Sequence, residues 1–130
     1  MHLDAAAMTG ATGSATITVT DADTAISAGS GDLPVLATPR MVALMEQAAC
    51  AALAPYLTPE STTVGVHVDV RHTAPTPIGV VVTASARVTE VSRSRVVLDV
   101  AAEQQRDGVS EQIGAGTHTR VVVDRASFPS

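Results

Sequence analysis

The segment TPRMVALMEQAACAALAPYL, residues 38–57, is apolar nearly all round. Its apolar residues recur at the spacing of an α-helix. Thr38 suits an N-cap, and Pro39 suits the first helical position, where a missing N–H does no harm. Because Pro55 should stop the helix, we predict it over about Pro39–Ala54. A helix of this kind is buried on most sides, so the rest of the chain must wrap around it.

Most of the remaining chain has an apolar period of two, which is typical of β-strands. Residues 14–20 (SATITVT) predict a first strand, and residues 21–37 predict a loop or short lid. Four runs follow the helix: TTVGVHVDVRHTA, GVVVTASARVTEV, RVVLDVAAEQQ and EQIGAGTHTRVVVD. The turns PTPIG, SRS and RDG separate them, which favours successive antiparallel hairpins. The pattern predicts an α+β fold, a curved antiparallel β-sheet wrapped around a long central α-helix.

Composition narrows the class of protein. With 130 residues, 45% of them hydrophobic, we expect one domain over residues 1–130, with a flexible leader over 1–13. The net charge of -5 and the lack of a basic cluster argue against a nucleic-acid partner. Cys50 is the only cysteine, and we expect no metal site. No apolar stretch approaches the roughly 18 residues of a membrane span, so we expect a cytoplasmic protein without a membrane partner.

One carboxylate interrupts the apolar helix. Glu46 lies at helical spacing from Val42, Ala49 and Leu53, so its side chain falls on an apolar stripe. A buried carboxylate is unfavourable unless it is paired or hydrogen-bonded. Glu46 is therefore either a functional acid or part of a solvated helix edge or polar subunit contact. The pattern alone favours neither interpretation.

His72 ends the strand-like run that follows the helix. Valines occupy every second position of this run: Val64, Val66, Val68 and Val70. If no bulge intervenes, His72 lies on the valine face toward the helix, and Gly65 lies on the opposite face. Glu46 and His72 then point at the same layer, an arrangement that tunes pKa values for acid–base chemistry. The alternative is a histidine that caps the strand end through the backbone.

Three further residues are candidates for ligand contact. Thr38 places a hydroxyl at the helix start, where free N–H groups favour an oxyanion or a carbonyl oxygen, although a simple N-cap is the stronger interpretation by itself. Arg120 shares a strand face with His118 and is suited to a phosphate or carboxylate, or is a surface cation. Gly65 lets a ligand approach the backbone, or marks a bulge.

Taken in order, these segments resemble the fluoroacetyl-CoA thioesterase group of hotdog-fold proteins. The resemblance lies in ATPRMVALMEQAACAALAPYL, TVGVHVDVRHTAPTPIG and EQIGAGTHTRVVV, and covers about Ala37–Val123. It implies a hotdog fold and a homodimer, or a tetramer, whose sheets join edge to edge with acyl-CoA sites at the interface. It implies no cofactor, because CoA is part of the substrate.

The resemblance also implies the site residues. The family's catalytic threonine, glutamate and histidine fall on Thr38, Glu46 and His72, and its ligand-contacting glycine and arginine fall on Gly65 and Arg120. We therefore expect hydrolysis of an acyl-CoA thioester to free acid and CoA. Glu46 is the expected nucleophile or general base toward water, His72 relays protons, and Thr38 holds Glu46 or polarises the thioester carbonyl.

One segment departs from the family's pattern. The fluoroacetyl-selective member has a phenylalanine-rich lid before its catalytic threonine, whereas ISAGSGDLPVLA contains no aromatic residue. This departure argues against fluoroacetyl selectivity and favours a short or medium acyl group. Two alternatives remain open: a non-catalytic module that binds acyl-CoA or another small acyl ligand, and a hotdog hydratase acting on enoyl-CoA. The hydratase is disfavoured because no Asp-x4-His arrangement lies beside the helix.

Overall fold

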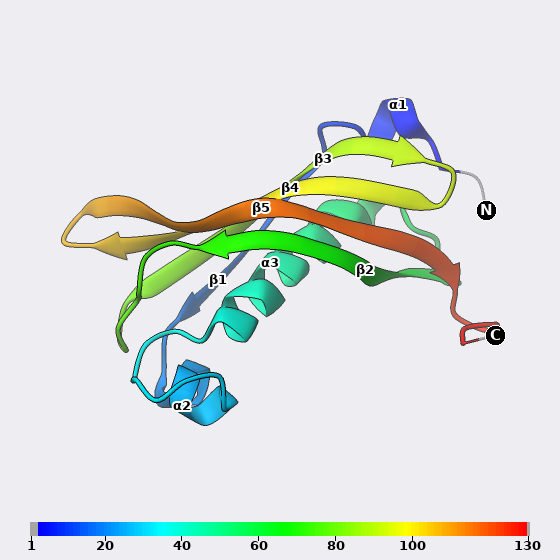
Figure 1. Cartoon of the computed structure of the whole chain (residues 1–130). Helices are drawn as coiled ribbons and strands as arrows, with labels where there is room; N and C mark the ends of the chain where they lie inside the picture. The colour runs from blue at the N-terminus through cyan, green and yellow to red at the C-terminus, as the bar shows by residue number, and fades with distance from the viewer. Residues whose placement is uncertain (1–2, 130) are drawn as a thin grey trace.

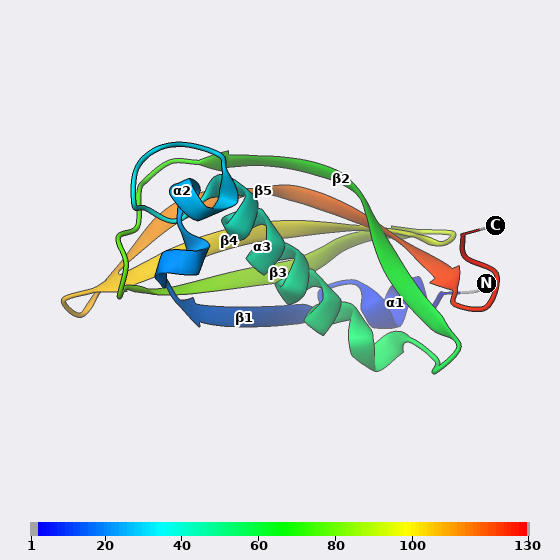
Figure 2. The same cartoon turned by 90° about the horizontal axis from the view of Figure 1, so that it is seen from below.

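A five-stranded antiparallel sheet curves around one long helix (Figures 1 and 2). The structure, a computed structural model, describes residues 3–129. The strands lie in the order β1-β3-β4-β5-β2. Their bounds are β1 (Thr12–Thr18), β2 (Ser61–His72), β3 (Val81–Ser92), β4 (Arg95–Arg106) and β5 (Val109–Asp124). The predicted α+β architecture is confirmed.

Helix α3 (Thr38–Leu53) crosses the inner face of the sheet. Its N-cap is Ala37, whose backbone is extended, and no side chain caps the helix. The expectation that Thr38 is the N-cap is therefore wrong, because Thr38 is already the first helical residue. Pro55 does not end the helical path at once, since the 3₁₀ turn η2 (Ala54–Tyr56) continues directly from α3.

The core lies between α3 and the sheet. Gly13 of β1 approaches α3 so closely that a Cβ there would overlap the helix backbone at Ala48 and Ala52. The opposite side of α3 is open, because Gln47 and Cys50 are exposed. The prediction of a helix buried on most sides thus holds for its apolar stripes, which contain Met41, Leu44, Met45, Ala48, Ala49, Ala52 and Leu53.

The strand connections differ from a simple series of hairpins. β3–β4 and β4–β5 are antiparallel neighbours joined by short turns, as predicted. β2, however, pairs with β5 at one edge of the sheet, and β3 lies near the other edge. The proline-rich segment 73–80 therefore is not a hairpin turn. It crosses the end of the sheet beside the segment before α3, where Thr76 O accepts a hydrogen bond from Leu36 N at 2.8 Å.

A β-bulge changes which side chains of β2 face the helix. The register against β5 shifts between Gly65 and His67, so Val66 is an extra residue. His72 faces α3, as expected. Gly65 also faces α3, because a Cβ at this position would point at the Glu46 carboxylate. The expectation that Gly65 faces away from the helix is therefore wrong. The four valines do not share one face, because the bulge reverses the alternation.

The N-terminal segment is structured. Residues Ala5–Met8 form the short helix α1, and Met8 is buried against the core at 1% exposure. The expected flexible leader is therefore wrong for the described residues of that segment, while residues 1 and 2 lie outside them. Residues 21–37 contain the 3₁₀ turn η1 (Asp21–Asp23) and the short helix α2 (Ala25–Ala28). Within residues 3–129, no helix has the length and apolar character needed to cross a membrane.

Candidate active site

Thr38 and His72 form a hydrogen-bonded pair at the start of α3. Thr38 Oγ1 lies 2.8 Å from His72 Nδ1, although the two residues belong to the helix and to the end of β2. Since the threonine hydroxyl does not cap the helix, it is available to the imidazole. The structure thus brings together two of the three residues predicted to be catalytic. It also argues against the interpretation of Thr38 as a simple helix cap.

The environment of His72 favours a neutral imidazole. Burial lowers the pKa of His72 below its ordinary value of 6.5, although the polar backbone of Ala74 beside the ring opposes the shift. His72 Nε2 is buried, and within residues 3–129 no protein group is hydrogen-bonded to it. With Nδ1 directed at the hydroxyl, a neutral ring can accept the proton of Thr38.

A cavity opens beside this pair. Its volume is about 300 Å³, and both Thr38 and His72 lie on its wall. Most of the other wall residues are small or apolar: Ala25, Ser30, Val35, Leu36, Thr73, Ala74 and Pro75. The hydroxyl–imidazole pair therefore lies where a small ligand can reach it.

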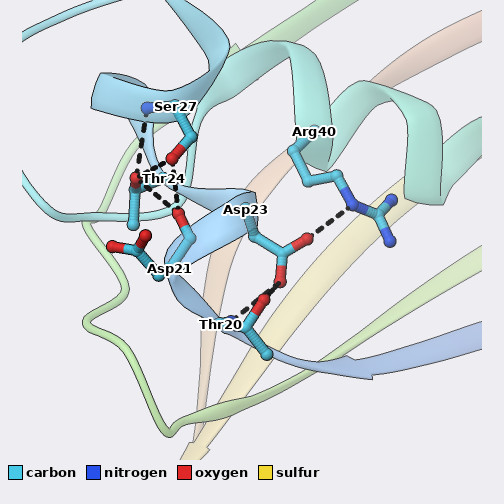
Figure 3. A network of polar contacts seen from close by, with 6 residues as sticks. All are labelled: Thr20, Asp21, Asp23, Thr24, Ser27 and Arg40. Atoms are coloured by element: carbon cyan, nitrogen blue, oxygen red, sulfur yellow. Dashed lines mark hydrogen bonds and ion pairs between the residues drawn. The ribbon is translucent and has the colours of Figure 1, made fainter.

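The segment that covers the cavity is fastened to the first turns of α3 (Figure 3). Asp23 accepts hydrogen bonds from Thr20 N at 2.8 Å, Thr20 Oγ1 at 3.0 Å and Arg40 Nε at 2.9 Å. Burial alone raises the pKa of the Asp23 carboxyl, but the hydrogen bonds from Thr20 and Arg40 outweigh it and hold the pKa below its ordinary value. Asp23 O also accepts from Ala37 N at 2.9 Å. The lid, residues 21–37, thus fixes the position of Ala37, the residue directly before Thr38.

Glu46 lies in a second polar group, near the middle of α3. Its Oε2 is 3.4 Å from Arg120 Nη1 and 3.8 Å from His118 Nε2. The side chain of Glu46 is 39% exposed, so the carboxylate is neither buried nor freely solvated. A Cβ at Gly65 would lie 2.8 Å from Glu46 Oε2, so the glycine leaves room for the carboxylate.

The second group contains residues that the sequence did not assign. Arg120 is only 7% exposed, so it is not a surface cation. His118 and Thr63 both bond to its guanidinium. A signal existed for His118, which shares a strand face with Arg120 at a spacing of two residues. No sequence signal distinguished Thr63 from the other threonines.

The two groups do not meet within one chain. Thr38 and Glu46 are separated by about two turns of α3, roughly 12 Å along its axis at 1.5 Å per residue. Thr38 bonds to His72, whereas Glu46 contacts Arg120 and His118. The expectation that Thr38 holds Glu46 is therefore wrong within a single chain. Gly65 and Arg120 belong to the Glu46 group.

Residues 19–126 match the family model described as fluoroacetyl-CoA-specific thioesterase. The chain belongs to this family. The fluoroacetyl-CoA thioesterase of Streptantibioticus cattleyicolor is 45% identical over 94 residues, which cover 72% of this chain. The same match spans 65% of that relative, slightly less than two thirds of its length.

Solved structures agree with the family assignment. A fluoroacetyl-CoA thioesterase structure superposes with a TM-score of 0.82 at 36% identity, covering 92% of this chain and 90% of the other. A thioesterase superfamily member from Thermus thermophilus gives a TM-score of 0.81 at 28% identity, covering 91% and 85%. A hot-dog-like protein from Thermanaerovibrio acidaminovorans gives 0.78 at 26% identity, covering 91% and 84%. The predicted family and hotdog fold are confirmed.

Proposed function

We propose that the chain is an acyl-CoA thioesterase that hydrolyses a short or medium acyl-CoA to the free acid and CoA. Family membership supports this reaction class. The observation that carries the proposal is the 2.8 Å contact between Thr38 Oγ1 and His72 Nδ1 on the wall of the 300 Å³ cavity. A hydroxyl bonded to a neutral imidazole is the arrangement of an activated oxygen nucleophile.

The mechanism follows from this pair. His72 Nδ1 takes the proton of the Thr38 hydroxyl as Oγ1 attacks the thioester carbonyl carbon. The carbon–sulfur bond then breaks, and His72 returns the proton to the CoA thiolate. Water attacks the resulting acyl-threonine ester with His72 as the base, which releases the acid and restores the Thr38 hydroxyl.

The start of α3 supplies a donor for the developing oxyanion. Arg40 N and Met41 N both donate to Ala37 O, and Pro39 has no N–H. Thr38 N is therefore the first-turn N–H left to stabilise negative charge, and the helix dipole reinforces it. This assignment keeps Thr38 at the reacting carbonyl, as expected from the sequence, but makes it the nucleophile.

Glu46 completes the site from a second copy of the chain. β2 is an edge strand with exposed valines, Val66 at 49% and Val68 at 42%, which suits antiparallel pairing with the β2 of a partner. Pairing centred between Val68 and Asp69 sets Gly65 beside His72 of the partner subunit. Glu46 then lies near the partner's hydroxyl–imidazole pair, where its carboxylate orients the water that hydrolyses the acyl-threonine. The homodimer is thus part of the proposal.

The acyl group is inferred from the cavity. Its described wall contains no Phe, Tyr or Trp, and its small volume suits a short or medium chain. Gly65 and Arg120 of the neighbouring Glu46 group are proposed to contact the substrate at the seam between the subunits.

The test is release of free thiol from acetyl-, fluoroacetyl-, butyryl- and hexanoyl-CoA by the wild type, Glu46→Gln and His72→Ala. We expect turnover by the wild type and a large loss in both variants. Undiminished turnover in both would remove the site assignment. Saturable binding of acyl-CoA without thiol release would instead support the non-catalytic binding module.

The composite site has its own test, because the two variants complement each other in a mixed dimer. After Glu46→Gln and His72→Ala chains are unfolded and refolded together, heterodimers contain one intact site if Glu46 comes from the partner. Recovery of about a quarter of wild-type activity is expected for random pairing. No recovery, with dimers demonstrated by sedimentation, would place Glu46 and His72 in the same chain's site.

A further inference from the structure

The Glu46 carboxylate is positioned by an arginine that is itself held on several sides. Arg120 Nε donates to Thr63 Oγ1 at 2.8 Å, and Nη2 donates to Thr63 O at 3.0 Å. Nη1 lies 3.1 Å from His118 Nε2 and 3.4 Å from Glu46 Oε2. All three guanidinium nitrogens therefore make polar contacts. Of the three partner residues, only Glu46 is an acid.

The hydrogen bonds of His118 define which ring nitrogen accepts. His118 Nδ1 lies 2.8 Å from His67 O, and a carbonyl oxygen can only accept, so Nδ1 carries a proton. In the neutral ring, Nε2 is then an acceptor for an N–H of Arg120. Since His118 is 2% exposed, protein atoms enclose the ring and leave it little freedom to turn.

The three contacts that hold Arg120 are shorter than its contact with the acid. The distances from Arg120 to Thr63 and His118 are 2.8–3.1 Å, whereas the distance to Glu46 is 3.4 Å. Thr63 and His118 thus set the position of the guanidinium, and Glu46 adjusts to it. Among residues 3–129, no hydrogen bond reaches Glu46 Oε1, so one carboxylate oxygen is held and the other can accept from water.

We propose that Thr63 and His118 are positioning residues, which fix Arg120 so that it holds the Glu46 carboxylate in its working orientation. This inference rests on the proposed function, because it assigns both residues an effect through Glu46. Neither side chain needs to contact the substrate. Their effect is therefore expected to be larger on kcat, through Glu46, than on KM, which changes only through the proposed contact of Arg120 with the substrate.

The first experiment compares Thr63→Val with Thr63→Ser. Valine removes the acceptor for Arg120 Nε while keeping the shape of threonine, and serine keeps the hydroxyl. We expect Thr63→Val to lower kcat about tenfold, the size of a lost hydrogen bond to a charged group, and Thr63→Ser to restore most of it. The matched control is Thr62→Val, the same change one residue away on the other face of β2, which should leave kcat within about twofold because its side chain points away from the guanidinium.

His118→Gln provides a second variant. Its amide oxygen can replace Nε2 as the acceptor for Arg120, but the contact with His67 O is lost. A kcat between those of the wild type and His118→Leu is expected, with thermal unfolding measured in each case. Equal loss in the Gln and Leu variants would overturn the role of the Nε2 acceptor.

A double-mutant cycle with Glu46→Gln separates positioning from general damage. If Thr63 acts through Glu46, Thr63→Val lowers the residual kcat of Glu46→Gln by less than about twofold, since the contact being positioned is already altered. An undiminished effect in that background, or a wild-type kcat in Thr63→Val, would overturn the inference. Absence of thiol release by the wild type would instead overturn the proposed function.

Discussion

The two polar groups along α3 differ in charge, exposure and origin. The Thr38–His72 pair is neutral, consists of a single side-chain hydrogen bond, and lies on a cavity wall at the helix start. The Glu46 group is charged and places a 39% exposed carboxylate on a buried arginine held by β2 and β5. The first group is suited to proton transfer, because desolvation keeps the imidazole neutral. The second is suited to holding a charge in one orientation.

The difference also concerns how each group depends on the rest of the chain. The position of Thr38 depends on the helix start and on the lid, through Asp23 and Ala37. The position of Glu46 depends on strand pairing, because Thr63, His118 and Arg120 all lie on the sheet. Changes to the lid should therefore affect the first group, and changes to β2 or β5 should affect the second.

The largest loss of activity is expected from Thr38→Val, which changes the first group alone. If Thr38 is the nucleophile, valine lowers kcat by about 10³-fold or more, while Thr38→Ser retains activity because it keeps the hydroxyl. Thiol release with each acyl-CoA measures the loss, and unchanged thermal unfolding shows that the fold persists. A Thr38→Val enzyme within tenfold of the wild type would show that the hydroxyl only orients His72.

The pH dependence should report the His72 of the first group. The pKa of His72 is lowered by burial, so the neutral base persists to lower pH than an ordinary imidazole of pKa 6.5. The value of kcat/KM should therefore begin to fall only below pH 6.5, and then by about tenfold per pH unit. A fall that begins at or above pH 6.5 would contradict the assignment of His72 as the base.

Gly65→Ala tests the second group with the smallest added side chain. The new Cβ would lie 2.8 Å from Glu46 Oε2 and 3.1 Å from His118 Cε1, so the carboxylate must move. We expect kcat/KM to fall about tenfold, because the Glu46 carboxylate, which is proposed to orient water, must shift away from the new Cβ. Gly79→Ala, at a glycine with open space but positive φ, provides a control for backbone effects. Full activity in Gly65→Ala would mean that the Glu46 position is not critical.

The weakest effect is expected from the lid. Asp23→Asn removes the ion pair with Arg40, and the amide oxygen can still accept from Thr20. Because Arg40 is partly exposed and the Ala37 N–Asp23 O backbone bond that positions Thr38 is kept, we expect KM to rise about two- to fivefold with kcat nearly unchanged. Asp32→Asn, an exposed acid in the same segment, should leave both constants unaltered. A large fall in kcat would show that the lid also controls the chemistry at Thr38.

The sequence predicted the main elements because their patterns are strong. An apolar segment bounded by Thr38 and Pro55 indicated the helix, and alternating valines indicated β2. The side-chain pairings were less accessible, since they depend on strand order. Successive runs favoured a β2–β3 hairpin, whereas β2 pairs with β5 and thereby brings Thr63 beside Arg120. The family resemblance assigned Arg120 but not the residues that hold it.

Local detail produced the other differences. The N-cap position shifted by one residue, which sequence patterns rarely define, and this freed the Thr38 hydroxyl for His72. The apolar helix also gave no sign of its open side: Cys50 is exposed, because the stripe of α3 containing Gln47 and Cys50 faces away from the sheet. Gly65 offered a signal for the bulge beside it, but the alternating valine run did not show whether the alternation was interrupted, so the orientation of Gly65 could not be derived.

The bulge carries a consequence for how chains of this kind can change in length. Gly65 and His72 lie an odd number of positions apart, and only the extra residue at Val66 turns both toward α3. Deleting that residue would leave them six positions apart on a regular strand, so both would still face α3. In an alignment, a one-residue gap at Val66 would therefore preserve the orientation of both residues, whereas a one-residue gap between His67 and His72 would turn one of them outward.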